Sequence, residues 1–162
     1  MSINSARAKE ENMGNKYRYT ESGLNNVVIE GIEVVKDDLG DTVYCIPNVR
    51  GLHRAIAHAI ITHDVGISGK ELRFLRTEMG LTQKELAKIL GVARVTVTRW
   101  ETAEKPIDRH AEFVVRMLAA EKLGINPDMP VEEMARRCGW KTQSGKIRID
   151  GRNPNQYRAV AA

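Results

Sequence analysis

The chain lacks the features that place a protein in or across a membrane. No stretch approaches the ~20 consecutive apolar residues that a membrane-spanning helix needs. The first residues, MSINSARAKEENMGNK, contain no apolar segment of the kind found in a secretory signal peptide. We therefore expect a cytoplasmic protein without a membrane partner.

Cysteine is also scarce. Cys45 and Cys138 are the two cysteines of the chain, and they lie far apart in the sequence. Two cysteines at this spacing do not make a disulfide framework or a four-ligand zinc site, so we interpret both as reduced thiols.

Catalytic and metal-binding patterns are missing as well. The sequence has no glycine-rich phosphate loop, no nucleophile motif and no converging carboxylates. His53, His58 and His63 recur at intervals of five, but five residues turn a helix by ~500°, so successive rings point about 140° apart. We predict exposed histidines, no metal, no cofactor and no enzymatic activity.

The positive charge of the chain lies in its second half. At 162 residues and 42% apolar content the chain can bury a core, and its net charge is +4. By region, the charge is −2 over residues 1–66, +3 over 67–124 and +3 over 125–162. Local positive charge attracts phosphates, which favours nucleic-acid binding there; on charge alone, a solvated basic surface without a partner is the alternative.

One segment, LTQKELAKILGVARVTVTRWE at 81–101, predicts two helices joined by a tight turn. Thr82 and Glu85 form a capping box, which starts a helix near Gln83. Gly91 supplies the left-handed residue that ends this helix. Its apolar face consists of Leu86, Ile89 and Leu90.

The second helix of this segment carries its own apolar stripe. Val97 and Trp100 lie three residues apart, so the two helices bury both stripes by packing against each other. The side chains predicted to point outward are Arg94, Val95, Thr98 and Arg99.

These residues resemble the Xre-type helix-turn-helix of phage repressors and bacterial antitoxins, whose pattern is LTQxELAxxLGVSxxTIxRWExG. The resemblance covers residues 68–118, about a third of the chain. It implies a lambda-repressor-like helical domain that binds double-stranded DNA. Two positions depart from the pattern: Ala93 replaces the usual Ser or Thr cap, and Ala103 replaces the usual glycine, so that the turn there is either strained or differently shaped.

Two further helices complete the predicted module. Ser68 and Glu71 form a second capping box, followed by Leu72, Leu75 and Met79 at helical spacing and by Gly80 as the stop. Asp108 is expected to cap a helix that ends at Gly124. Its apolar side is predicted to consist of Val114, Met117, Leu118 and Leu123.

The resemblance also assigns roles. In a helix-turn-helix the second helix enters the major groove, so Arg94 and Arg99 are the predicted base readers, with Val95 against a thymine methyl group and Thr98 beside them. Gln83, Lys84 and Thr96 are predicted to contact phosphates. Arg76 and Glu101 match positions that form a structural ion pair in phage repressors; two independently solvated charges are the alternative.

The chain as a whole is predicted to be mainly α, with a small α+β domain before the DNA-binding module. Residues 1–16 are expected to form a disordered arm. Residues 17–66 are expected to contain a hairpin around DDLGD, within 27–46, and a helix at about 49–62. The helix-turn-helix domain is placed at 67–124. Residues 125–162 are expected to form a short helix, bracketed by Pro130 in its first position and Gly139, and a basic tail that is disordered by default, although Lys146–Asp150 is compatible with a short strand.

The predicted function is transcription regulation in a bacterial cytoplasm or nucleoid, most simply repression of the protein's own operon by a homodimer on a palindromic operator. The alternative is an antitoxin that also binds a toxin through its N-terminal half. A small domain before an Xre-type module is similar to the MqsA-type antitoxins, but their zinc-binding CxxC pairs are absent here, where only Cys45 is found. The acidic N-terminal region would suit a basic toxin as partner.

Overall fold

The computed structural model describes residues 15–139 and 145–160, and these form two compact units. Unit 1 contains the chain up to Ile56 together with the segment from Lys146 onward, and unit 2 runs from Ala57 to Gly145. This division differs from the expected boundaries near residues 66 and 124. Most of the predicted N-terminal arm lies outside the described residues, but Lys16 belongs to a strand.

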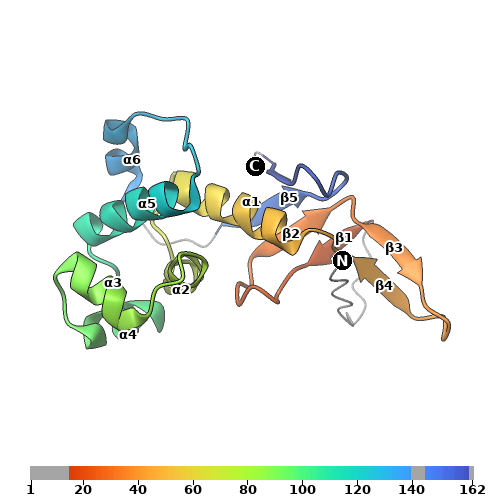
Figure 1. Cartoon of the computed structure of the whole chain (residues 1–162), viewed down its shortest axis with the longest axis horizontal. Helices are drawn as coiled ribbons and strands as arrows, with labels where there is room; N and C mark the ends of the chain where they lie inside the picture. The colour runs from red at the N-terminus through yellow and green to blue at the C-terminus, as the bar shows by residue number, and fades with distance from the viewer. Residues whose placement is uncertain (1–14, 140–144, 161–162) are drawn as a thin grey trace. The chain divides into compact units, whose positions relative to one another are not determined.

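Unit 1 is built on a four-stranded sheet in the order β1-β2-β5-β6 (Figure 1). Its strands are β1 (Lys16–Arg18), β2 (Val27–Glu30), β5 (Ile147–Asp150) and β6 (Arg158–Ala159). The two central strands, β2 and β5, run parallel, with Val27 opposite Ile147, and the outer strands are antiparallel to their neighbours. The expectation of a disordered C-terminal tail is therefore wrong for residues 145–160, because this segment completes the sheet.

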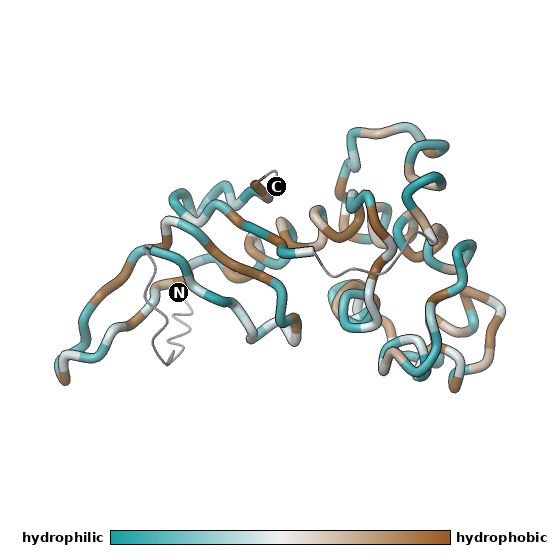
Figure 2. Tube along the Cα trace, turned by 180° about the vertical axis from the view of Figure 1, so that it is seen from behind, coloured by the Kyte–Doolittle hydropathy of each residue, from teal (hydrophilic) through white to brown (hydrophobic). Residues whose placement is uncertain are grey.

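The core of unit 1 follows from alternation along the central strands. Every second residue of β2 and β5 is buried, so that one face of the sheet is apolar. Helix α1 (Val49–Thr62) has the predicted bounds, and its first half contributes buried Leu52 and Ile56. The hydroxyl of Tyr19 lies 2.8 Å from Nε2 of His53. Figure 2 shows the hydrophobic residues along these strands.

A separate two-stranded hairpin follows β2. It consists of β3 (Glu33–Lys36) and β4 (Thr42–Cys45), and its turn lies at the predicted DDLGD segment. Asp37 shapes this turn, because its Oδ1 accepts hydrogen bonds from the N–H groups of Leu39 and Asp41, both at 2.9 Å. Gly31 separates β2 from β3: its φ is +74°, and a Cβ there would lie 2.5 Å from Cγ of Arg152.

Unit 2 is helical. Besides the second half of α1 it contains α2 (Gly69–Glu78), α3 (Gln83–Leu90), α4 (Arg94–Glu101), α5 (Arg109–Leu123) and α6 (Val131–Arg137). The chain is thus mainly α with a small sheet, as predicted. Pro130 is the N-cap of α6 and not its first helical residue. Within the described ranges, no helix is long and apolar enough to cross a membrane.

The buried face of α5 differs from the prediction. Asp108 caps the helix and Gly124 ends it, as expected, but the inward face carries the charged pair Glu112 and Arg116 together with small apolar residues. Val114 is 40% exposed. The predicted apolar side instead lines a shallow surface groove of about 440 Å³, whose walls include Phe113, Val114, Met117, Leu118 and Ile125.

The buried pair holds the segment that leads into α2. Arg116 is fully buried and donates to the carbonyl oxygens of Ile61, His63 and Val65. Glu112 accepts from Arg116 at 2.7 Å and also from the backbone N–H of Ile67 at 3.1 Å. A buried charge pair needs such additional hydrogen bonds, and here they come from the connecting backbone.

The prediction of exposed histidines is wrong, since His53, His58 and His63 are all half-buried. His53 bonds to Tyr19, and Nε2 of His63 lies 2.7 Å from Oε2 of the buried Glu71. Although burial alone would raise it, the pKa of Glu71 is held below its ordinary value by the hydrogen bond and charge of His63 and by the hydrogen bonds of Ser68. His53 belongs to unit 1 and His63 to unit 2.

Candidate nucleic-acid interface

The first helix of the predicted interface, α3, begins at a capping box. Oγ1 of Thr82 accepts from the backbone N–H of Glu85 at 3.1 Å, and Oε2 of Glu85 accepts from the N–H of Thr82 at 2.7 Å. The backbone N–H of Thr82 and, to a smaller extent, its hydroxyl, which donates to Oε2 of Glu85 at 3.0 Å, hold the pKa of Glu85 below its ordinary value. The carboxylate therefore stays ionised at the positive end of the helix dipole.

The turn between α3 and α4 is closed by Gly91, which has φ +68° and ψ +31°. This is the left-handed conformation that ends a helix without strain in glycine. Helix α4 then starts after Ala93, which has the backbone angles of an N-cap but forms no side-chain cap hydrogen bond. The second helix of the motif thus begins with an uncapped turn.

Helix α4 divides into a buried and an outward side. Val97 is fully buried and Trp100 is 3% exposed, so this side packs into unit 2. The opposite side presents Arg94, Val95 and Arg99 to solvent, with Val95 53% exposed. Thr96 and Thr98 are half-buried, and Thr98, which was expected to point outward, is hydrogen-bonded to Gln83 of α3.

Arg76 and Glu101 tie α2 to the end of α4. The Arg76 guanidinium donates to both carboxylate oxygens of Glu101 and, through Nη1, to the carbonyl oxygen of Leu81 at 2.8 Å. The side chains are only 14% and 4% exposed, respectively. The geometry is that of a bidentate pair shielded from water, which fixes the orientation of α4 more firmly than two exposed charges would.

Gln83 extends this pair into a network. Its Nε2 donates to Oε2 of Glu101 at 2.8 Å, and its Oε1 lies 3.0 Å from the hydroxyl of Thr98. Two predicted DNA-contacting residues, Gln83 and Thr98, are thereby brought together and held. Sequence reasoning missed this link, because the two residues are on different helices.

One segment of the chain matches a known protein family. Residues 72–109 match the helix-turn-helix family model HTH_3. The matched segment runs from α2 to the start of α5 and includes both α3 and α4. Comparison with curated proteins and with solved structures gave no match. The match supports a helix-turn-helix regulator that binds DNA.

Gly69, the first residue of α2, also shapes the helix-turn-helix, and this role was not predicted from the sequence. A Cβ at this position would lie 2.3 Å from the carbonyl oxygen of Trp100 and 2.8 Å from that of Glu101. The N-terminus of α2 therefore approaches the C-terminal carbonyls of α4 at a distance that only glycine permits. The sequence feature that could have indicated this close approach is the glycine itself, which directly follows the Ser68 cap.

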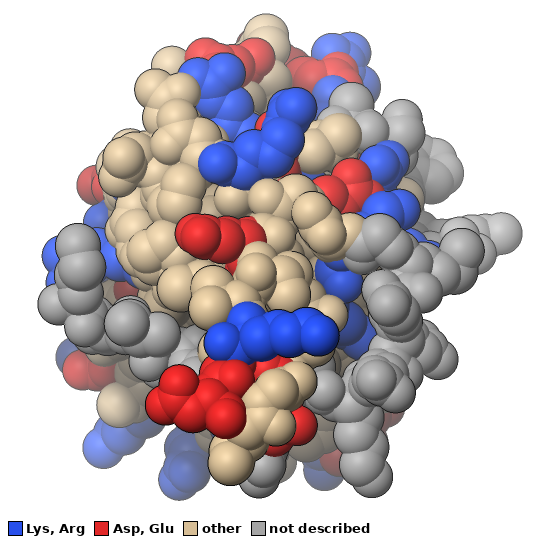
Figure 3. All heavy atoms as spheres, turned by 90° about the vertical axis from the view of Figure 1, so that its right-hand side faces the viewer, with Lys and Arg blue, Asp and Glu red and all other residues tan. Residues whose placement is uncertain are grey.

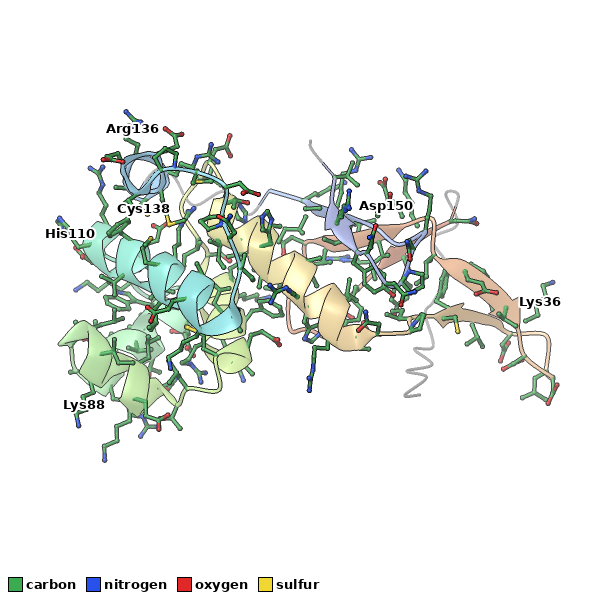
Figure 4. All side chains as sticks on the ribbon, turned by 45° about the horizontal axis from the view of Figure 1, so that its top comes forward. Lys36, Lys88, His110, Arg136, Cys138 and Asp150 are labelled. Atoms are coloured by element: carbon green, nitrogen blue, oxygen red, sulfur yellow. The ribbon has the colours of Figure 1, made fainter. Side chains whose placement is uncertain are left out.

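Exposed cations lie on α3 as well as on α4. Lys84 and Lys88 on α3 are exposed, and Figure 4 shows Lys88 extending away from the helices. Nε of Arg99 lies 3.6 Å from Oε1 of Glu104, but both side chains are more than half exposed, so this pair is weak. Arg99 is thus able to exchange its carboxylate partner for a nucleic acid.

The turn after α4 retains a strained residue. Ala103 has φ +59°, which is in the left-handed region. The chain therefore keeps the backbone of a glycine-type turn with a residue that has a Cβ, at a cost of about 1 kcal/mol. Of the two possibilities that the sequence left open here, the structure has the strained one.

Proposed function

We propose that the protein is a sequence-specific double-stranded DNA-binding transcription regulator, most simply a repressor of its own operon. The observation that carries this proposal is the division of α4: Val97 and Trp100 hold one side in the core, while Arg94, Val95 and Arg99 are presented together on the other. In a helix-turn-helix, the residues on that outward side face base edges in the major groove.

Two arginines are proposed as base readers. A guanidinium can donate twice to O6 and N7 of guanine, and each such pair discriminates by about 1 to 3 kcal/mol. Arg94 lies at the start of α4 and Arg99 near its end. Val95 is proposed to contact a thymine methyl group, and Thr98 to reach a base from its position beside Gln83.

Phosphate contacts are proposed for Gln83, Lys84 and Thr96. Gln83 and Lys84 are the first residues of α3, where free backbone N–H groups and the helix dipole attract an anion. The amide nitrogen of Gln83 has two hydrogens and uses one for Glu101, so the other remains for a phosphate. These contacts would set the position of α4 without reading sequence.

A homodimer on a palindromic operator is part of the proposal. A single module of this size makes few base contacts, and helix-turn-helix proteins usually gain affinity by placing two modules about one helical turn apart. The net charge of the matched region is positive, which would speed the approach to DNA.

Selection of bound sites from random DNA, followed by fluorescence anisotropy on the selected site, tests the proposal. Arg99→Ala should weaken binding about 5- to 150-fold and relax the preference at one base pair in each half-site. Lys84→Ala should weaken binding to all sequences alike and lower the slope of log affinity against log salt by about 1.

Arg136→Ala is the matched control, because Arg136 is an exposed arginine on α6, outside the segment that matches the family model. It should leave base preference unchanged. If Arg99→Ala binds the selected site with unchanged affinity and preference, α4 is not the reading helix.

A toxin partner, as in an antitoxin, is the second candidate, and one observation about charge favours it. The described acidic charge of unit 1 is concentrated in the β3–β4 hairpin, which carries four carboxylates against Lys36. A basic toxin would be attracted to such a surface. Stoichiometric co-purification of a small basic protein with the chain, lost when the hairpin acids are neutralised, would favour this function over simple repression.

A further inference from the structure

Among the described residues, the β3–β4 hairpin is supported at its base. Ile32 and Ile46, which flank it, are buried, and the rings of Tyr44 and Tyr17 lie 4.7 Å apart. Beyond this base, all four residues of β3 are exposed, and Leu39 in the turn is 83% exposed. In the described part of the chain, β3 and the turn of the hairpin are thus left largely open to solvent.

Apolar side chains lie on both faces of this ribbon. Val34 and Val35 are neighbours in one strand and therefore point to opposite faces, and they are 41% and 46% exposed. In the described part of the chain, β3 and β4 pair only with each other, so both outer edges are open. A two-stranded ribbon of this kind is marginal in water unless something covers it. Figure 2 shows hydrophobic residues along the hairpin and at its tip.

The negative charge of the hairpin excludes DNA as the molecule that covers its apolar side chains. Glu33, Asp37, Asp38 and Asp41 face one cation, Lys36, which gives residues 33–45 a net charge of −3. Phosphates would be repelled from this surface. Figure 3, seen from the hairpin side of Figure 1, shows carboxylates beside uncharged surface, and Figure 4 shows Lys36 extending outward.

The rest of unit 1 has the opposite charge. Its described residues outside the hairpin contain eight Lys or Arg against three Asp or Glu, a net charge of +5. Residues 1–66 are acidic when counted by sequence, but the sheet of unit 1 also contains β5, which comes from the basic C-terminal segment. Once that segment joins the sheet, the acidic charge of the described residues of unit 1 is concentrated in the hairpin.

Much of this positive charge lies on the outer face of the sheet, opposite the buried side chains. Alternation places Lys16 and Arg18 of β1, Arg148 of β5 and Arg158 of β6 on that face. Glu30 pairs with Lys16 and Arg148, and Asp150 pairs with Arg152, so the net positive charge of this face comes chiefly from Arg18 and Arg158. Val160, 38% exposed, lies next to Arg148 through a backbone hydrogen bond and adds apolar surface.

We propose that the hairpin is the self-association element of the protein, and that it docks on the outer sheet face of a second copy. A second copy supplies both requirements, a positive surface for the acids and apolar surface for the valines and Leu39. If each hairpin lies on the partner's sheet, the contact is reciprocal and closes as a twofold dimer. The proposal supplies the second copy that the palindromic operator requires, and rests on the proposed function only in that respect.

Sedimentation velocity of the full chain without DNA, over a range of concentration and salt, tests this inference. The wild-type protein should dimerise, and its dissociation constant should rise with salt because screened charges contribute to the contact. Leu39→Ser should raise the dissociation constant about tenfold or more, since a Leu side chain is no longer buried on association. Asp38→Lys and Arg158→Glu should each raise it and reduce its salt dependence.

Two matched variants separate the hairpin from other apolar surfaces. Val131→Ser removes an apolar side chain that is 52% exposed on α6, and Met117→Ser alters the groove along α5. Both should leave the dissociation constant unchanged, with folding of every variant checked by circular dichroism. A wild-type monomer at the highest concentration reached, a dimer lost only in Met117→Ser, or a hairpin that binds only a different, basic protein would each overturn the proposal.

The same measurement distinguishes this proposal from the proposed function. Arg99→Ala should remain dimeric, because Arg99 belongs to unit 2 and to the DNA-facing side of α4. Loss of DNA binding in a protein that still dimerises through the hairpin would refute the proposed function alone. Intact DNA reading in a protein whose hairpin variants dimerise normally would refute the hairpin contact alone.

Discussion

Glu112→Ala should destabilise unit 2 far more than an ordinary surface change, because it leaves a buried cation without its counter-charge. Arg116 is fully buried, and Glu112 is 2% exposed. Both nitrogens of the guanidinium that face Glu112 donate to its Oε1, at 2.7 and 3.1 Å. The other oxygen of the carboxylate accepts from the N–H of Gly139 at 3.0 Å.

The magnitude follows from what remains after the substitution. Arg116 keeps three carbonyl partners but no negative charge, and removing one member of a buried pair typically costs about 3 to 5 kcal/mol. The N–H groups of Ile67 and Gly139 also lose their acceptor. Because domains are stable by only about 5 to 15 kcal/mol, this loss is a large share of the total.

Urea titration followed by far-ultraviolet circular dichroism measures the effect. The helical signal reports mainly on unit 2, which contains α2 to α6 and half of α1. We expect the midpoint of Glu112→Ala to fall by more than about 1 M. Glu121→Ala, an exposed glutamate on the same helix, is the control and should stay within about 0.5 kcal/mol of wild type. Equal stabilities of the two variants would refute the reasoning.

Three other predictions concern the helix ends. Ala93→Ser should stabilise the protein by about 1 kcal/mol in the same titration, because the backbone already has N-cap angles and lacks only the side-chain acceptor; no gain would mean that the first turn of α4 is satisfied otherwise. Gly69→Ala should destabilise by about 1 to 3 kcal/mol, since its Cβ would overlap the carbonyl oxygen of Trp100, and unchanged stability would show that α2 and α4 are not held this closely. The pKa of Glu71 is lower in the folded protein, so the stability that its ionised carboxylate contributes is present above the ordinary pKa of 4.5 and is lost as the pH falls through the folded pKa. Glu71→Gln should therefore be less stable than wild type at neutral pH and lose less stability on acidification. Parallel curves of stability against pH for the two proteins would contradict this.

Several parts of the fold could be predicted because their causes are local. A capping box joins residues three positions apart, and both predicted boxes, at Ser68 with Glu71 and at Thr82 with Glu85, are confirmed. The glycine after α3 is left-handed, as predicted. The turn of the β3–β4 hairpin and the bounds of α1 likewise follow from patterns within a few residues.

Other parts could not be predicted because their causes are distant in the sequence. The parallel pairing of β2 with β5 joins Val27 to Ile147, and no pattern near either strand indicates that partner. On α5, hydrophobicity favoured the wrong face, since the side chain of Arg116 is buried against carbonyl groups at the end of α1 and in the segment after it. Gln83 and Thr98 each match a DNA-contacting position, but their hydrogen bond to each other depends on how α3 and α4 pack.

The amino-acid sequence by itself determined the two helices of the motif, their capping box and turn, and the outward position of Arg94, Val95 and Arg99, because helical periodicity and side-chain capping act over three or four residues. Only the tertiary structure decided that the basic C-terminal segment joins the N-terminal sheet. It also decided that the acidic charge of the described residues of unit 1 is concentrated in the β3–β4 hairpin, and that a buried arginine holds the chain between α1 and α2. Burial and charge compensation depend on which distant segments meet, so these features exist only once the chain is folded.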